Sequence, residues 1–270
     1  MTEATPRFTI VLPCFNEGPR IAGSLATLDR WFGSGPEILV IDDGSVDETA
    51  RLAEEFAATH SNVRVRRLPH AGKGGAIRAG FAAARGDLVL LTDADLAYDR
   101  DSIDRVLSAL ASVDLAVGNR RHDRSRYSVP VNLFGFLYRR HLVGLLFNAF
   151  VRALLQVGVR DTQCGLKGFR RAALEQMAGS LRANGFTIDV EVLLVARALG
   201  LRLAEVPVHV TYYSAKSSVK LIRTGASMAA EVVRIAARRA RGCYSPARVR
   251  ASAARSQLKT ATRSEEESIR

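Results

Sequence analysis

Short apolar runs alternate with amphipathic stretches through the first 120 residues of the chain. The runs FTIVLP (8–13), EILVIDDGS (37–45), VRVRRL (63–68), DLVLLTDAD (87–95) and LAVGN (115–119) have the length and β-branched content of strands. Helix-like segments separate them, among them VDETARLAEEFAAT (46–59) and AGKGGAIRAGFAAARG (71–86). Strands that alternate with helices predict right-handed βαβ units, and therefore an α/β fold with a mostly parallel sheet flanked by helices.

Acidic and amide side chains stand at the carboxyl ends of three of these strands. In a parallel sheet the carboxyl ends lie on one rim, and ligands bind there. Turn and capping chemistry accounts well for one such group, but much less well for three at once. The groups are Asn16 with Glu17, Asp42 with Asp43, and Asp93 with Asp95.

Asp93 and Asp95 follow a strand that is otherwise apolar, where charged groups are unfavourable without a partner. Two carboxylates at a strand end can offer oxygens to a hard divalent cation that phosphates also bind, and Mg²⁺ and Mn²⁺ favour such ligands. The cation would neutralise the charge that builds up on a departing diphosphate. The pair therefore predicts a site for Mg²⁺ or Mn²⁺ next to a phosphorylated ligand.

The alternation of strand-like and helix-like segments ends after residue 120. The segment 131–159 is strongly apolar but is interrupted by Arg139, Arg140, His141 and Arg152, so it never reaches the ~20 mostly apolar residues of a spanning helix. Two interpretations stay open: one or two helices that lie in a membrane interface, or a buried helical hairpin of the domain.

The C-terminal third predicts further elements and a tail. The segment GFTIDVEVLLVARALG (185–200) reads as a helix and LRLAEVPVHV (201–210) as a strand. Residues 219–243 have the pattern of a basic amphipathic helix, which suits either an anionic membrane surface or plain packing with a solvated basic face. We expect one domain over 1–218, this helix, and a disordered tail over 244–270.

The composition and charge of the chain limit the kinds of partner and the location that we expect. A formal net charge of +12 favours an acidic partner such as a nucleic acid, an anionic membrane or a phosphorylated substrate, unless it is only a solvated surface. Three scattered cysteines argue against a zinc site or a disulfide framework, and the acidic N-terminus does not suit a signal peptide, so a cytoplasmic location is expected. The motifs of P-loop enzymes, dinucleotide-binding dehydrogenases and common hydrolases are missing.

The ordered motifs FTIVLPCFNEG, EILVIDDGSVDET, AGKGGAIRAG, TDADLA, VGNR, DTQCGLKGF and EVPV resemble those of family 2 glycosyltransferases. The resemblance runs from Phe8 to Arg223 and is greatest to polyprenyl-phosphate (dolichyl-phosphate) sugar synthases, in particular the dolichyl-phosphate β-glucosyltransferase branch. It implies a Rossmann-like GT-A fold. It also implies inverting transfer from a nucleotide sugar, which in this branch is a UDP-sugar, to a polyprenyl phosphate at the inner face of the cell membrane.

The resemblance also implies roles for individual residues. Ala97 stands where related mannose synthases have a metal-binding Gln, so the metal ligand set departs from theirs at this position. Asp161, Asp189 and Glu191 match family positions that either orient arginines, approach the acceptor, or only cap and pair. The implied nucleotide-sugar ligands are Pro13, Phe15, Glu17, Ile41, Asp43, Lys73, Asp93, Ala94 and Lys220; the metal ligand is Asp95; the catalytic set is Asp93, Asp95, Arg120 and Asp161; the acceptor phosphate meets Arg120, Arg139 and Arg140.

The absence of a Ser/His/Asp arrangement agrees with this chemistry, because an ionised lipid phosphate can attack the sugar without a strong general base. The protein then orients the reactants and stabilises the leaving group. Two other interpretations stay open: the same fold with a soluble or polysaccharide acceptor, and a basic protein that binds a membrane or a nucleic acid without catalysis. The second leaves the acidic rim unexplained, so we expect no nucleic-acid partner.

Overall fold

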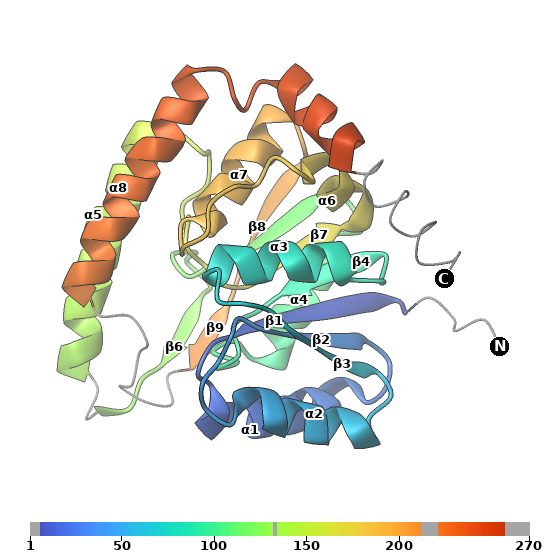
Figure 1. Cartoon of the computed structure of the whole chain (residues 1–270). Helices are drawn as coiled ribbons and strands as arrows, with labels where there is room; N and C mark the ends of the chain where they lie inside the picture. The colour runs from blue at the N-terminus through green and yellow to red at the C-terminus, as the bar shows by residue number, and fades with distance from the viewer. Residues whose placement is uncertain (1–5, 132–133, 212–220, 257–270) are drawn as a thin grey trace.

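The structure is a computed structural model that describes residues 6–131, 134–211 and 221–256. Its central feature is a seven-stranded sheet of order β3-β2-β1-β4-β7-β5-β8 (Figure 1). The strands are β1 (Phe8–Cys14), β2 (Glu37–Asp42), β3 (Val63–Arg67), β4 (Leu88–Leu91), β5 (Leu115–Asn119), β7 (Lys167–Arg170) and β8 (Leu203–Pro207). All five strands predicted in the first 120 residues are present, which confirms the predicted α/β class.

β7 is the exception to the parallel arrangement, because it runs antiparallel to both β4 and β5. The sequence analysis did not predict this strand. It has only four residues, KGFR, and its lysine is fully buried, so neither its length nor its polarity is typical of a core strand. It lies in the centre of the sheet and brings the motif DTQCGLKGF beside the end of β4.

Helices cover both faces of the sheet, which explains why β1 and β2 are apolar on both sides. α1 (Gly18–Phe32) and α2 (Thr49–Thr59) lie together on one face, and α3 (Lys73–Ala83) lies on the other (Figure 1). α3 can approach closely because Gly80 faces β1: a Cβ there would lie 2.3 Å from Val11 Cγ1. α4 (Arg100–Ala109), capped by the Asp99 carboxylate, packs against β5, β7 and β8.

The apolar segment after residue 130 forms one helix, α5 (Phe134–Leu155), so the alternative of a buried helical hairpin is wrong. α5 packs against α8 (Leu221–Ala240) along one edge of the molecule (Figure 1). Among the described residues, no helix is both long and apolar enough to cross a membrane. α5 misses that mark because arginines and a histidine interrupt it.

The C-terminal elements depart from the prediction in two places. The strand expected over 201–210 is divided into β8 and β9 (His209–Thr211), and β9 pairs with β6 (Arg126–Ser128) in a separate two-stranded sheet. Residues 246–256 form a helix where disorder was expected, because Val249 and Ala253, one turn apart, are buried in the core. α6 (Arg171–Met177) and α7 (Ile188–Ala198) precede these elements.

Candidate active site

The three groups of polar residues at strand ends meet on one rim of the sheet, as predicted. β1 pairs in parallel with β2 on one side and with β4 on the other, and Cys14 lies opposite Asp42. Burial raises the pKa of the Cys14 thiol, and the negative charges of Glu17, Asp42 and Asp93 raise it further. These carboxylates therefore surround one end of β1 and concentrate negative charge there.

The turn after β4 presents Asp93 and Asp95 at this rim. Leu96, the next residue, has φ of +44°, which a leucine side chain rarely adopts. The Ala94 carbonyl accepts a hydrogen bond from Ser24 Oγ at 2.6 Å, and this bond fixes the turn to α1. Backbone strain of this kind is typical of functional sites, where the surrounding structure maintains it.

The two aspartates have opposite electrostatic environments. Burial would raise the pKa of Asp93, but Lys73, whose Nζ lies 2.7 Å from Asp93 Oδ1, lowers it below the usual value. Loss of solvent around the Asp95 carboxylate and the neighbouring charge of Asp93 raise the pKa of Asp95 to about 6. Although neighbouring groups enclose part of its carboxylate, Asp95 as a residue is exposed, so it is the carboxylate of the pair that remains open to a ligand.

Behind Asp93 lies a chain of alternating charges. Asp189, on α7, receives Lys167 Nζ at 2.5 Å and has Lys73 Nζ at 3.7 Å. Lys167 is fully buried, and its ammonium also donates to the Cys164 carbonyl. The sequence analysis singled out Asp189 but missed Lys167, whose only signal was a lysine inside the motif DTQCGLKGF. The arrangement holds Lys73 between two carboxylates.

Two glycines allow the backbone to pack tightly around these charges. A Cβ on Gly165 would lie 2.2 Å from Asp93 Oδ2, and the Gly165 amide donates to the Tyr98 hydroxyl at 3.2 Å. A Cβ on Gly74 would lie 2.0 Å from the Ala183 carbonyl oxygen. Any side chain at either position would therefore displace the rim or the start of α3.

The residues expected to hold a nucleoside lie on the other side of the rim. Phe15 is 40% exposed and stacks on His70, with ring centroids 4.4 Å apart. His70 Nδ1 lies 2.9 Å from Asp43 Oδ2, and Asp43 also accepts hydrogen bonds from the Ala71 and Gly72 amides at 2.8 and 2.9 Å. Asp43 therefore anchors the loop before α3, and Phe15 provides the open aromatic surface.

Pro13, Ile41 and Glu17, which were also predicted to bind the nucleotide sugar, lie near Phe15 and Asp43. Pro13 is in β1, in register with Ile41 of β2, and Ile41 is completely buried. Ile41 can therefore shape the floor of the site through packing only. Glu17, at the start of α1, forms an ion pair with Arg20 at 2.8 Å.

Arg120 and Asp161 form a bidentate pair beside the acidic rim. Arg120 Nε and Nη2 donate to the two Asp161 oxygens at 2.7 and 2.9 Å, and the Arg120 amide donates to Asp161 Oδ2 at 3.1 Å. Burial would raise the pKa of Asp161, but Arg120 lowers it to about 2. Of the roles left open for Asp161, this geometry favours that of orienting an arginine.

The remaining predicted residues are less defined. Arg139 and Arg140 belong to α5, but their side chains are not among those that the structure describes, and Lys220 lies outside the described residues. Across residues 6–131, 134–211 and 221–256, no group of three His, Cys, Asp or Glu side chains could hold a metal ion. Two carboxylates in one turn, Asp93 and Asp95, are the number of protein ligands typical of a cation that takes its other ligands from phosphates and water.

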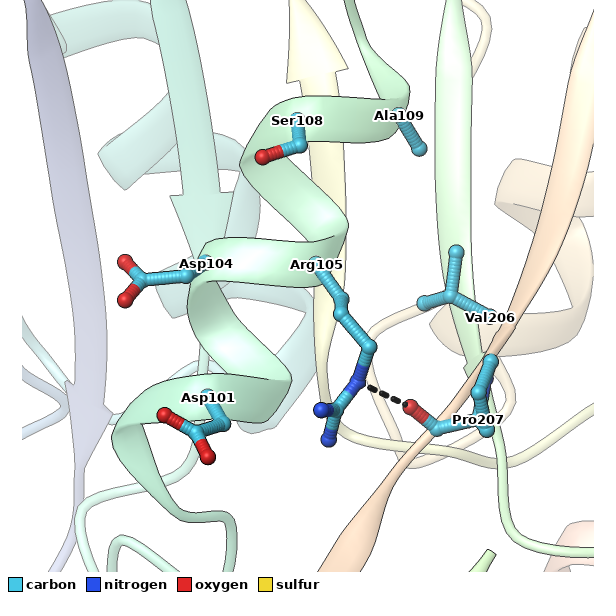
Figure 2. Close-up of a pocket in the computed structure, with 7 residues that line it drawn as sticks. All are labelled: Asp101, Asp104, Arg105, Ser108, Ala109, Val206 and Pro207. Carbon is cyan, nitrogen blue, oxygen red and sulfur yellow. Dashed lines mark hydrogen bonds between the residues drawn. The ribbon is translucent and has the colours of Figure 1, made fainter. Parts of the chain in front are cut away.

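A separate groove of about 580 Å³ lies between α4 and β8 (Figure 2). Arg105 Nε donates to the Pro207 carbonyl at 3.0 Å, while Asp101 and Asp104 point away from that arginine (Figure 2). None of the predicted site residues lines this groove. The candidate chemistry therefore belongs to the rim.

Comparison with known proteins identifies the family of this chain. The sequence profile of the family described as "Glycosyl transferase family 2" matches residues 9–178. A dolichyl-phosphate beta-glucosyltransferase of Trichomonas vaginalis is 32% identical over 218 residues, which cover 74% of this chain and 62% of that protein. The dolichyl-phosphate beta-glucosyltransferase of Dictyostelium discoideum is 30% identical over 243 residues, with 84% and 73% covered. The chain thus spans less than two thirds of the first relative's length.

A solved structure has a similar fold. Glucosyl-3-phosphoglycerate synthase from Mycobacterium tuberculosis, in complex with Mn²⁺, uridine diphosphate and glucosyl-3-phosphoglycerate, superimposes with a TM-score of 0.56. The match covers 84% of this chain and 77% of that one at 20% identity, so it bears on the fold.

Proposed function

This chain belongs to glycosyl transferase family 2 and has the GT-A fold, and from that premise we propose that it transfers a sugar from a nucleotide sugar to a polyprenyl phosphate. The family establishes that the chain is a glycosyltransferase, and several of its similar relatives are dolichyl-phosphate β-glucosyltransferases. The donor, the acceptor and the stereochemical course, which we take to be inversion, are the proposal. A UDP-sugar is the donor that the glucosyltransferase relatives favour.

The observation that carries the acceptor is the link between α5 and the Arg120–Asp161 pair. Asn148 of α5 accepts a hydrogen bond from the Thr162 amide at 3.0 Å and donates to the Arg160 carbonyl at 3.0 Å, on either side of Asp161. Arg121, next to Arg120, donates to the Gly144 carbonyl of α5 at 3.2 Å. An apolar helix is therefore hydrogen-bonded directly to the loops that carry Arg120, the arginine that we propose binds the acceptor phosphate.

The surface of α5 suits the lipid part of such an acceptor. Its large apolar side chains are well exposed, and Leu146 reaches 73%. A lipid phosphate could lay its chain along these side chains with the phosphate at Arg120, where a guanidinium binds phosphate oxygens bidentately. Arg139 and Arg140 of the same helix are proposed to assist. The exposed set on α5 is Tyr138, Leu142, Val143, Leu146, Phe150 and Leu154.

On the donor side, the rim residues are proposed to orient the nucleotide sugar and to neutralise the charge of its diphosphate. Phe15 is proposed to stack on the base, and Lys73 to offer its charge to the diphosphate. A phosphate oxygen of the acceptor then forms a bond to the anomeric carbon as the bond from that carbon to the nucleoside diphosphate breaks. Asp95, beside Asp93, is proposed to hold Mg²⁺ or Mn²⁺, which when bound neutralises charge on the departing diphosphate. The Mn²⁺ and UDP complex of a protein with the same fold is the precedent.

The same proposal places α5 and α8 against a membrane, because a polyprenyl phosphate is held in a bilayer. The apolar surface of α5 would enter the interface, and exposed α8 arginines such as Arg234 would meet anionic head groups. The net charge of +12 favours the inner face of a cell membrane, and attachment would be peripheral.

A transfer assay tests the proposal. Purified protein, Mg²⁺ or Mn²⁺ and a short polyprenyl phosphate are incubated in turn with labelled UDP-glucose, UDP-N-acetylhexosamines and GDP-mannose. The expected result is label that moves into the organic phase from one donor and is lost with EDTA or in Asp95→Ala. Metal-dependent hydrolysis of a donor without any lipid product would overturn the lipid acceptor and point to a water-soluble one.

A further inference from the structure

A basic cavity lies beneath the last turn of α8, at the end of the molecule where the helix 246–256 packs beside α6 (Figure 1). Its volume is about 270 Å³, and none of the rim residues lines it. Three parts of the chain build it: the turn after α6, the end of α8 with the turn that follows, and the helix 246–256. The charged residues in its wall are Arg182, Arg238, Arg248 and Arg255.

Within the described residues, Glu191 is the carboxylate paired with an arginine of this wall, Arg238, and it offsets only part of the positive charge there. The lining contains no acidic residue. Glu191 is fully buried and already accepts hydrogen bonds from the Tyr244 hydroxyl and from the Arg182 and Ala183 amides at 2.5 to 2.7 Å. Within the part of the chain that the structure describes, the guanidinium groups of Arg182 and Arg255 have no hydrogen bond or ion pair.

Two buried polar atoms at the cavity lack a hydrogen-bond partner. Ser180 is 6% exposed and its Oγ, in the lining, has no partner among the described residues. Arg238 forms a side-chain hydrogen bond with Tyr244, but its Nη1 is buried without a hydrogen bond to any described residue and lies 3.6 Å from Glu191 Oε1. Buried donors are almost always satisfied in folded proteins, and a buried donor without a partner is costly, so both atoms would gain from an acceptor placed in the cavity.

We propose that this cavity binds a phosphate-bearing anion. Guanidinium groups that converge from three elements match the several acceptor oxygens of a phosphate, and a phosphate monoester carries up to two negative charges. Ser180 Oγ would then gain a partner, and so would Arg238 Nη1, the atom of that guanidinium without a hydrogen bond. The volume admits a phosphate together with a small attached group. This inference does not depend on the proposed glycosyl transfer.

The walls of the cavity are held in place without a ligand, which favours binding. Ser252 Oγ donates to the Gly179 carbonyl at 2.7 Å, and this bond joins the helix 246–256 to the turn after α6. Gly179 has φ of +75°, and a Cβ there would lie 2.8 Å from the Ser252 carbonyl oxygen. The contact is therefore close and specific, and little ordering remains for the ligand to induce.

Cys243 gives a local readout, because it lines the cavity and is partly exposed, whereas Cys14 and Cys164 are buried. Burial also raises the pKa of both buried thiols, to about 11 for Cys164, which makes them unreactive. The experiment measures the rate at which neutral iodoacetamide alkylates Cys243 in the full chain, by peptide mass spectrometry. Inorganic phosphate is titrated at constant ionic strength with chloride as the balancing anion.

We expect saturating phosphate to slow alkylation about tenfold in the wild type. The same protection is expected in Arg250→Ala, an exposed arginine of the same helix outside the cavity. Arg248→Ala/Arg255→Ala, both exposed positions, should lose most of the protection with an unchanged thermal midpoint, and Ser180→Ala should weaken it. Equal protection in the double variant and the control, or no protection of the wild type by any phosphate offered, overturns the proposal.

Two further arms identify the source of the phosphate. Glycerol 3-phosphate represents a soluble phosphate ester, and phosphatidylcholine vesicles with or without phosphatidate represent a lipid head group. Protection by the soluble ester supports a free metabolite-like ligand, and protection only by phosphatidate vesicles supports a head group. In either case the protection must disappear in the double variant, and persistence there counts against the site.

Discussion

The acidic rim and the α5–α8 edge use their side chains in opposite ways. At the rim, charged groups are closed into pairs: Lys73 with Asp93, Lys167 with Asp189, and a buried aspartate with Arg120. Along α5, large apolar side chains are exposed to solvent. Both regions depart from the usual rule that charge lies outside and apolar surface inside.

The difference indicates two kinds of ligand. Paired charges in a desolvated rim are preorganised for a small, highly charged ligand, since electrostatic interactions there need no rearrangement. An exposed apolar helix lacks such directional groups and suits an extended apolar partner. Asn148 and Gly144 connect the two regions, so a ligand with a charged head and an apolar tail would contact both at once.

The largest effect is expected for Asp95→Ala, which tests whether the rim holds a metal ion needed for transfer. The proposed role of Asp95 is to hold a cation that offsets charge on the leaving group, which is worth several kcal/mol. We therefore expect transfer to fall ~1000-fold, which corresponds to about 4 kcal/mol. Steady-state assays with a labelled donor measure the loss.

The control for this variant is its stability. Asp95 is exposed and the hydrogen bond that its carboxylate accepts from the Ala97 amide is 3.3 Å long, so the thermal midpoint should stay close to that of the wild type. An Asp95→Ala protein that is stable and retains wild-type transfer would show that the rim does not carry the metal.

Asp161→Asn tests whether the rim is a closed set of charges. The substitution leaves Arg120 beside a neutral partner, and breaking a buried pair in this way costs about 3 kcal/mol in the free energy of unfolding. The pH dependence should change as well. The pKa of Asp161 is about 2 when folded and about 3.9 when unfolded, so its carboxylate contributes about 2 to 3 kcal/mol.

The sign of that contribution follows from the lowered pKa. It is fully present above pH of about 4 and is lost as the pH falls through about 2. Urea unfolding from neutral pH to about pH 2 should therefore show the difference between wild type and Asp161→Asn shrinking as the pH falls. A constant difference over this range would mean that Asp161 has an ordinary pKa in the folded protein.

These two regions were also predictable to different degrees. The rim followed from the sequence because acids end three apolar runs, and parallel strands align their carboxyl ends. The pairs within it did not, because Lys167 lies in a short polar strand without period-2 alternation, and its contact with Asp189 spans 22 positions. Pairing of Arg120 with Asp161 was only one of several alternatives, because the two residues are 41 positions apart and the sequence does not show whether such residues meet in the fold.

For the helical edge, the sequence indicated an apolar segment but not its partner. The composition of 131–159 could not separate an interfacial helix from a hairpin, because both need the same apolar surface. The helix 246–256 was missed because polar residues surround its two buried positions, Val249 and Ala253, and tertiary packing decides the outcome there.

Leu146→Asp sharpens the comparison at the helical edge. Leu146 is 73% exposed, so the substitution should leave the free energy of unfolding within about 0.5 kcal/mol. If the side chain enters a bilayer, burial contributes ~1.5 to 3 kcal/mol, and its loss should weaken vesicle binding at least tenfold. Co-sedimentation with anionic vesicles measures this, with Val46→Asp, 91% exposed in the loop after β2, as the matched control. Equal weakening by both variants would remove the special role of α5.

The smallest effects, and the ones that compare the two regions most directly, come from glycines. A Cβ on Gly225 of α8 would meet nothing within 4 Å, whereas one on Gly165 would lie 2.2 Å from Asp93 Oδ2. Gly225→Ala should therefore raise the free energy of unfolding by about 0.5 to 1 kcal/mol through helix propensity. Gly165→Ala should lower it by about 1 kcal/mol or more, because the rim cannot accommodate a methyl group. Urea unfolding measures the change in the free energy of unfolding for both variants. If both changes had the same sign, the rim would accommodate a methyl group as readily as the helical edge, and the contrast between a fixed rim and an open edge would be wrong.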